Sequence, residues 1–403
     1  MKGSRAAVFA AISVIVGVPL LAAQGSNSGP VARYDIRAGT VSGVGAMGAG
    51  SMMSMMFGGR GGNAAQHELY LRLGSSRAAE KGAAKAEHFM PPTARLGKSV
   101  LLVTPREERG GTDELPQKPK GRLLIFWGCG MNAPKGQPVV IDFAKLAAGQ
   151  MPSGLWTTTI VRDWGPTLAN SRTFGRWPAE DGKYVKPDSS LLGAHRIVSN
   201  YAPEIAFTAA RDFMRPLSVS SRQQAGGATV INWSAVPEAT GYLAFITGGK
   251  MGPGGEMGDM VLWTSSASRQ FGGGLSDWLS PSQVAGLVKD KTILPPTATS
   301  CVVPIEVREA TPDFRFGTLT AFGPEEAFSY PPRPTEAGKP WNLEWTARIR
   351  HRSMTSWMDG QGMMMGAMNS ADDGAPAQQQ QKKCKPRGLG GMLGGVLGGG
   401  GGC

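Results

Sequence analysis

Alternating apolar and polar positions predict β-strands along much of this chain. Residues 34–41 alternate weakly, and residues 67–73 place three leucines on one face of a half-buried strand. The glycine- and methionine-rich stretch 43–62 between them is typical of the tip of a hairpin. We therefore expect these two segments to be strands of one hairpin with a mobile connection.

Further apolar runs follow in the first half of the chain. They predict a buried strand over 122–127, a short helix over 142–147 after an apolar run at 139–141, and strands over 156–161 and 191–198. Asp142 is the expected N-cap of the helix. Strands separated by Gly, Pro and Asn turns, with few helical periods, predict an all-β domain over 24–210.

The second half carries the pattern of a known family. Residues 228–246 resemble the second and third strands of a fibronectin type III domain, with Trp233 on one strand and Tyr242 on the next. Residues 319–324 resemble the later strand of that family and its exit turn. The resemblance covers about residues 216–332, and it implies a β-sandwich whose core contains both aromatic side chains.

Two further elements depart from or extend this sandwich pattern. A helix is predicted over 280–288, because Ser280, Pro281 at the first turn and Gln283 form a capping box. Residues 341–352 alternate again and predict one more strand that packs back on a sandwich.

The two ends differ in composition from the rest. Residues 1–23 combine a short basic segment, an apolar run and small residues, which is the order of a secretory signal peptide. The alternative is an uncleaved membrane anchor, because the apolar run approaches the length that spans a bilayer. The C-terminal end is rich in glycine and methionine, and a basic cluster lies near Lys382.

The predicted fold class is mainly β, with two β-sandwich-like domains, few short helices, and flexible Gly/Met-rich loops and tail. The predicted segments are a signal peptide over 1–23, an N-terminal all-β domain over 24–210, a fibronectin type III-like domain over 216–335, an additional strand segment over 336–358 and a disordered basic tail over 359–403. We expect an exported protein that is periplasmic, associated with the cell envelope, or secreted.

The net charge of the chain indicates which kinds of partner it can bind. The 403 residues include 42 Lys and Arg against 30 Asp and Glu, a formal net charge of +12. A basic exported protein meets an envelope or membrane surface, anionic lipid or acidic polysaccharide more readily than nucleic acid, although positive charge also serves plain solubility. A protein partner is the other expected contact.

Methionine is unusual in its placement, since fourteen of the 20 lie in three Gly-rich segments. Flexible methionines make adaptable apolar surfaces for membranes or partners, and unselected low complexity is another explanation. Thioethers also suit Cu(I), the one cofactor considered. The candidate metal ligands, chosen by their Met-x2-Met spacing, are Met52, Met53, Met55, Met56, Met257, Met260, Met365 and Met368.

Tryptophan and cysteine supply the remaining candidates. Trp156, Trp164 and Trp177 flank turns and could stack on sugar rings, with core or edge packing as the alternative. Four cysteines in an exported chain predict disulfides, and the favoured pairs are Cys129 with Cys301 and Cys384 with Cys403.

No catalytic residue is assigned from the sequence, because neither Cys129 nor His195 has the flanking signature of a nucleophile or base. The main hypothesis is a non-enzymatic exported or cell-envelope protein that contacts surfaces or partners through its β-sandwich domains, Met/Gly-rich loops and basic tail. The alternatives are a Cu(I)-binding protein and a hydrolase of envelope polysaccharide. The hydrolase would need two close, enclosed carboxyl groups.

The N-terminal pattern leads to a test of export. We expect the native protein to have lost its first residues by cleavage near Ala23 or Gly25, which N-terminal sequencing of the mature protein would show. A chain that keeps Met1 and stays in the cytoplasm would contradict both export and the predicted disulfides.

Overall fold

The computed structural model describes residues 29–46, 65–105, 121–150, 161–179, 183–252, 257–270, 272–336 and 339–359. In chain order, its strands are β1 (Ala32–Gly43), β2 (Gln66–Ser75), β3 (Ala86–Phe89), β4 (Val100–Leu102), β5 (Arg122–Trp127), β6 (Val139–Asp142), β7 (Thr173–Trp177), β8 (Tyr184–Val185), β9 (Gly193–Ser199), β10 (Ile205–Ala209), β11 (Val219–Gln223), β12 (Thr229–Trp233), β13 (Gly241–Met251), β14 (Met257–Thr264), β15 (Ser300–Val303), β16 (Phe314–Tyr330) and β17 (Trp345–Asp359). The helices are α2 (Phe143–Ala147), α3 (Pro281–Lys289) and α4 (Ile305–Ala310), with 3-10 turns η1 (Val44–Ala46) and η2 (Pro92–Ala94). The fold is mainly β with few short helices, as predicted.

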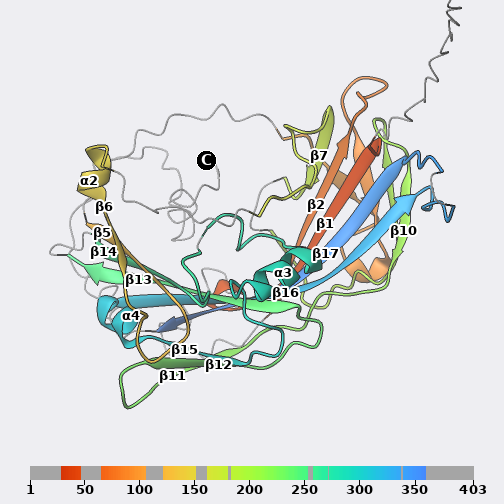
Figure 1. Cartoon of the computed structure of the whole chain (residues 1–403). Coiled ribbons are helices and arrows are strands. Elements are labelled where there is room, and N and C mark those ends of the chain that lie inside the picture. Colours follow the sequence, from red (N-terminus) through yellow and green to blue (C-terminus); the bar gives the residue numbers. More distant parts are fainter. Residues whose placement is uncertain are drawn as a thin grey trace, which may run out of the picture.

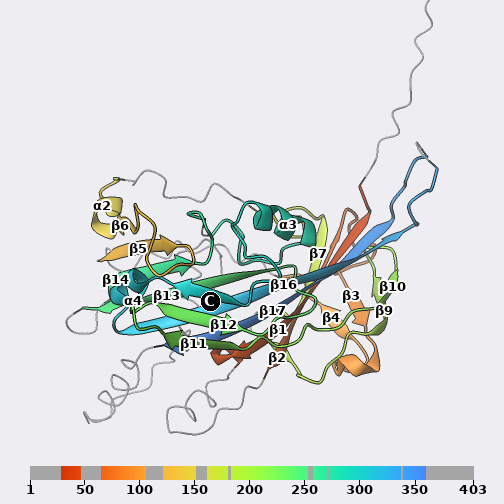
Figure 2. The same ribbon diagram turned by 60° about the horizontal axis from the view of Figure 1, so that its bottom comes forward.

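The strands form three sheets (Figure 1). The largest has the order β6-β5-β14-β13-β16-β17-β1-β2-β7, and β8 pairs with β2 beside this path. The smaller sheets have the orders β10-β9-β3-β4 and β11-β12-β15. Strand β16 pairs with β13 and with β17, and β17 pairs in turn with β1. The long strands β16 and β17 therefore connect the two ends of the large sheet into one continuous sheet (Figure 2).

One core lies between the three-stranded sheet and the β5-β14-β13-β16 part of the large sheet. Trp233 on β12 and Tyr242 on β13 are both buried there, and their ring centroids are 5.6 Å apart. The Tyr242 hydroxyl accepts a hydrogen bond of 2.9 Å from the backbone N–H of Val236. Trp233 and Tyr242, which the resemblance places in a sandwich core, are therefore both buried in a core between two sheets.

A second core lies between the four-stranded sheet and strands β1, β2 and β17. Leu69, Leu71 and Leu73 of β2 are fully buried in it, which confirms that they share a face. Ile197 and Ile205 of the four-stranded sheet pack against the same cluster. The alternation of β2 thus reflects its contact with this core.

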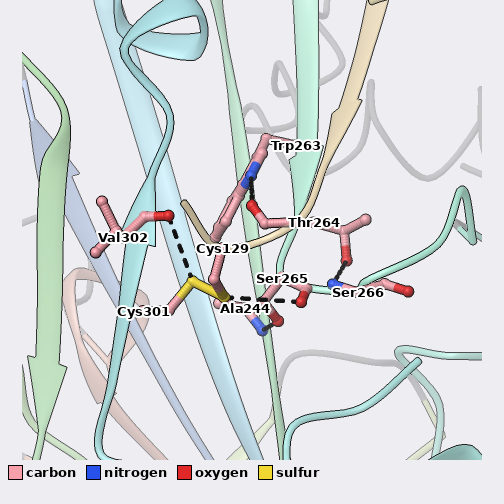
Figure 3. Close-up of a disulfide and its surroundings, with 9 residues drawn as sticks. Cys129, Ala244, Trp263, Thr264, Ser265, Ser266, Cys301 and Val302 are labelled. Atoms are coloured by element: carbon pink, nitrogen blue, oxygen red, sulfur yellow. Dashed lines mark hydrogen bonds between the residues drawn. A yellow bond between two sulfur atoms is a disulfide. The ribbon is translucent and has the colours of Figure 1, made fainter. Parts of the chain in front are cut away.

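A disulfide connects the large sheet to the three-stranded sheet (Figure 3). It joins Cys129, just after β5, to Cys301 on β15, and their Cα atoms are 5.3 Å apart. Nearby, the indole N–H of Trp263 donates to the carbonyl oxygen of Gly128 at 2.9 Å. This is the pairing that the sequence favoured.

Both predicted helices are confirmed together with their caps. The Asp142 carboxylate accepts hydrogen bonds from the backbone N–H groups of Ala144 and Lys145 at the start of α2. Ser280 and Gln283 form the reciprocal capping box of α3. Helix α3 packs against the face of the large sheet opposite the three-stranded sheet, because Val284 and Leu287 join a cluster with residues of β13 and β16.

Three sequence predictions are corrected. The exit turn predicted at residues 323–324 is absent, because β16 continues to Tyr330 and a shift in register between Phe322 and Glu325 accommodates Pro324, which has no N–H to donate. The last strand begins at Trp345 rather than at residue 341. Strand β2 is covered on both faces rather than half-buried, because its polar face also lies in the interior.

Several predictions lie outside the described residues: the signal peptide, the strand over 156–161, the Cys384–Cys403 pair and the tail. The division into domains stays a prediction. Strand β5, from the predicted N-terminal domain, pairs in parallel with β14 of the predicted second domain. Within the part of the chain that the structure describes, none of the helices has the length and apolar composition needed to cross a bilayer.

The aromatic pair in the first core leads to a stability prediction. Trp233→Ala should lower the free energy of unfolding by about 3 to 5 kcal/mol, because it removes a large buried side chain and leaves a cavity. Urea unfolding of the purified protein measures this. Asn232→Ala, at the exposed neighbouring position, is the control and should change the free energy by less than about 0.5 kcal/mol. Equal effects of the two substitutions would show that Trp233 does not support the core.

Candidate functional site

Charged side chains cover one face of the large sheet, opposite the second core. Asp35 lies on the central strand β1, where its cross-strand neighbours are Arg348 on β17 and Arg72 on β2. Its side chain is fully buried. The next residue on the same face of β17 is Arg350, which is also buried. Alternation along three adjacent strands therefore brings several arginines to one aspartate.

Asp35 accepts hydrogen bonds from three arginines. Arg72 Nη2 lies 2.6 Å from Oδ2, Arg348 Nε lies 2.6 Å from Oδ1, and Arg350 Nη2 lies 2.9 and 3.0 Å from the two oxygens. Arg37 Nε adds an ion pair at 3.5 Å. We call Asp35, Asp163 and these four arginines the arginine–aspartate network.

Asp163 enters the network from the segment before β7. Its carboxylate contacts Arg37 and accepts hydrogen bonds from Arg72 at 2.7 Å and from Arg348 and Arg350, both at 3.1 Å. The Oδ2 atoms of Asp163 and Asp35 therefore share the same Nη2 atom of Arg72. Two carboxylates thus lie close together in an enclosed place, which is the arrangement that a hydrolase would require.

The electrostatics of the two carboxylates do not suit proton transfer. Burial alone would raise the pKa of Asp35, but the guanidinium groups of Arg350, Arg72 and Arg348 lower it to about 2. Burial opposes ionisation of Asp163 as well, yet the pKa of Asp163 is held well below its usual range by Arg37 and Arg72. Because a glycosidase acid needs a raised pKa, neither group is poised to donate a proton near neutral pH.

Trp278 covers the network on the side away from the sheet. Its backbone carbonyl accepts a hydrogen bond from Arg350, and its ring centroid lies 4.0 Å from Cζ of Arg352. Arg352 in turn donates to Glu68 Oε1 at 2.8 and 3.0 Å. The charged face is therefore paired and covered over most of its length, which fixes these side chains in place.

An open groove of about 330 Å³ lies at the edge of the network. Its lining includes residues of β1, β16 and β17 together with Trp164 and Trp341. The lining residues are Arg33, Tyr34, Asp35, Trp164, Gly165, Pro166, Glu325, Ala327, Phe328, Ser329, Trp341, Thr346, Ala347 and Arg348.

The network positions one of the two tryptophans. Asp163 is anchored by four arginines and accepts a hydrogen bond from the N–H of Gly165 at 3.0 Å, so the intervening Trp164 is held at the surface with 69% of its area exposed. Gly165 is required there, because a Cβ atom would lie 2.5 Å from Arg72 Nη2. Arg33 also donates to the Trp164 carbonyl oxygen at 3.4 Å.

The second tryptophan of the groove lining is Trp341, between β16 and β17. Its indole N–H donates to the carbonyl oxygen of Pro331 at 2.9 Å, and the guanidinium of Arg333 lies 5.7 Å from its ring centroid. Glu325 lies in the groove lining, and its Oε2 atom is buried without a hydrogen-bond partner among the described residues. The groove lining thus combines aromatic residues, a carboxylate and arginine donors.

A chain of hydrogen bonds runs through the second core, beneath the groove. Tyr34 Oη lies 2.8 Å from His88 Nδ1, His88 Nε2 lies 3.0 Å from His195 Nδ1, and His195 Nε2 lies 2.7 Å from the carbonyl oxygen of Leu191. One set of neutral tautomers satisfies all three bonds, with each donor directed from Tyr34 toward Leu191. Burial lowers the pKa of both histidines, which favours the neutral forms.

The candidate site residues that were selected from the sequence lie in different parts of the structure. Trp164 lies in the groove, whereas Trp177 is on β7 beneath Lys183, whose Nζ is 5.3 Å from its ring centroid. Met257 and Met260 lie on β14, and the copper hypothesis stays a prediction. Outside the described residues are Trp156, Met52, Met53, Met55, Met56, Met365 and Met368.

Sequence reasoning missed Asp35, Asp163, Glu325 and Trp341. The available signal was the period-two placement of charged residues on β1 and β17, opposite their apolar faces. Among the described residues, no group of three or more His, Cys, Asp or Glu side chains is placed to hold a metal ion. Neither a protein-family model nor a curated protein matches this chain.

The buried histidines lead to a pH prediction. Because their pKa values are lower in the folded protein than the unfolded value of about 6.5, the unfolded chain binds protons first, and stability falls as pH drops below about 6.5. His88→Gln should reduce this slope by up to about 1.4 kcal/mol per pH unit. Denaturant unfolding between about pH 5 and 7.5 measures the slope.

The matched control is Tyr34→Phe, which removes one hydrogen bond of the chain but no titrating histidine. Its slope should equal that of the unmodified protein, although its stability is lower at every pH. An unchanged slope in His88→Gln would show that His88 does not take up a proton on unfolding.

Proposed function

We propose that this protein is a non-enzymatic exported protein that binds envelope polysaccharide in the groove between Trp164 and Trp341. The observation that carries the proposal is a groove whose lining includes two tryptophans, arginine hydrogen-bond donors and the carboxylate of Glu325. This combination suits a sugar, which presents apolar C–H surfaces and many hydroxyl groups.

Each part of the groove corresponds to a part of a saccharide. The large flat rings of Trp164 and Trp341 can pack against the C–H face of a pyranose ring. Glu325 can accept a hydrogen bond from a hydroxyl group, and Arg33 and Arg348 can donate to hydroxyl oxygens. Because the groove is open and lies on a rigid sheet, a polymer can enter without a large rearrangement.

The state of the carboxylates favours binding over hydrolysis. Asp35 and Asp163 are close together, but their lowered pKa values and their arginine contacts keep both of them ionised near neutral pH. A retaining or inverting glycosidase needs one carboxyl group that stays protonated. The arrangement therefore supports a fixed scaffold for the groove rather than an acid and base pair.

The scaffold supports the fibronectin type III-like proposal in part. Strands β11, β12 and β15 form one sheet, and β13, β14 and β16 belong to the sheet packed against it. The second and third strands of this unit, β12 and β13, therefore lie in different sheets, as the resemblance implies. The disulfide supports export, because such bonds persist in oxidising compartments.

A direct binding measurement tests the proposal. We expect fragments of the native envelope polysaccharide, titrated into the full-length protein by calorimetry, to bind in the micromolar to millimolar range, as is typical for a small open site. Trp164→Ala and Trp341→Ala should each weaken binding about 5-fold or more, because stacked aromatic surface contributes about 1 to 3 kcal/mol.

The control is Tyr184→Ala, which removes another exposed aromatic side chain, one that does not line the groove. Its affinity should match that of the unmodified protein. Binding that is unaffected by both tryptophan substitutions would exclude the groove, and cleavage of the polysaccharide by the protein would favour the hydrolase alternative.

A further inference from the structure

We infer that the ligand of this groove is an acidic saccharide of the uronic acid class, whose carboxylate is bound by Arg33 and Arg348. The inference rests on the proposed function, because it specifies the sugar that the same site takes. Three features of the groove carry it: the position of Arg348, the net positive charge of the network and groove together, and the carboxylate of Glu325.

Arg348 is a preorganised cation at the edge of the network. Its Nε donates to Asp35 and its Nη2 donates to Asp163, so the guanidinium plane is fixed from two directions. Its side chain is 25% exposed, more than those of the other three arginines of the network, and it lines the groove. An arginine held in this way loses little conformational entropy when it binds an anion.

The local charge balance favours an anion. The network holds four arginines against Asp35 and Asp163, and the only further carboxylate in contact with it among the described residues is Asp277, 3.4 Å from Arg37. One positive charge therefore remains. Arg33 adds another, since its hydrogen bonds go to the backbone carbonyl oxygens of Trp164 and Asn170, which carry no net charge. The carboxylate of Glu325 in the groove lining offsets one of these charges, so a single positive charge remains over the network and the groove together.

Glu325 favours an acidic sugar over a simple anion as the ligand. This residue lines the groove, where a carboxylate repels a second carboxylate but accepts a hydrogen bond from a hydroxyl group. The groove lining thus combines two arginines, two carboxylates and two tryptophan residues. A sugar ring with one carboxylate and several hydroxyl groups can pair with the arginines and with Glu325, whereas a neutral sugar leaves the remaining positive charge uncompensated.

The test compares two probes that differ only in their acidic groups. Oligogalacturonate and the same oligosaccharide with its carboxylates reduced to hydroxymethyl groups are titrated into the full-length protein at constant low ionic strength. We expect the acidic form to bind at least about 10-fold more tightly, since charge-assisted hydrogen bonds to arginine are lost on reduction. Equal affinities would overturn the inference while leaving saccharide binding intact.

Substitutions in the groove test whether the preference for the acidic oligosaccharide arises there. Arg33→Gln and Arg348→Gln should each reduce the ratio of the two affinities to within about twofold of unity, with a circular dichroism spectrum like that of the unmodified protein. Arg222→Gln removes an exposed arginine on β11, outside the groove, and should leave the ratio unchanged. A preference that survives in both groove variants would reflect general attraction to a basic chain and would overturn the inference.

A third arm distinguishes a sugar carboxylate from a lipid phosphate. Vesicles that contain phosphatidylglycerol are added to the unmodified protein and to Trp164→Ala and Arg33→Gln. Vesicle binding that both substitutions abolish, together with no affinity for oligogalacturonate, would overturn the inference in favour of an anionic lipid. Failure of both oligosaccharides and of the native polysaccharide fragments to bind would overturn the proposed function itself.

Discussion

Burial of the Asp35 carboxylate is the constraint on which the site depends. A fully buried charge costs several kcal/mol of desolvation unless it is surrounded by partners with good geometry. Arg72, Arg348 and Arg350 supply those partners only when β2, β1 and β17 lie side by side in the observed register, since a slip of one residue would turn the arginines toward the apolar core. The register of these strands and the burial of the charged Asp35 therefore depend on each other.

The same arginines also connect the buried Asp35 to residues at the protein surface. They need a second carboxylate, and Asp163 provides it from a segment outside the central strands. Trp164 follows it directly in the chain, so satisfying the buried charges also displays an aromatic ring beside the groove. On the far side, the long strands β16 and β17 lead to the connection that carries Trp341. The continuous sheet explains how residues distant in sequence form one rigid groove.

Local patterns could predict the elements but not this assembly. The alternation at 67–73 and the capping box at Ser280 depend on residues within a few positions of one another, and both are confirmed. Contact between Asp35 and Arg348 depends on parallel pairing of β1 with β17, which are separated by most of the chain. The exit turn at 323–324 was implied by the resemblance to the fibronectin type III family, whereas pairing with β17 keeps β16 extended past that point. Trp164 could be selected from its place beside a turn, but its partner Trp341 could not.

The network and the histidine chain lie on opposite sides of β1, and burial has different consequences for them. Arginine contacts lower the pKa of Asp35 to about 2, so its carboxylate stays ionised in mild acid. His88 and His195 instead occupy the apolar core, where burial lowers the pKa and protonation opposes folding. Phe207 stacks on His195 and on Phe328, and Phe328 lines the groove. The groove therefore depends on arginine-held charges on one side of β1 and on aromatic packing around neutral histidines on the other.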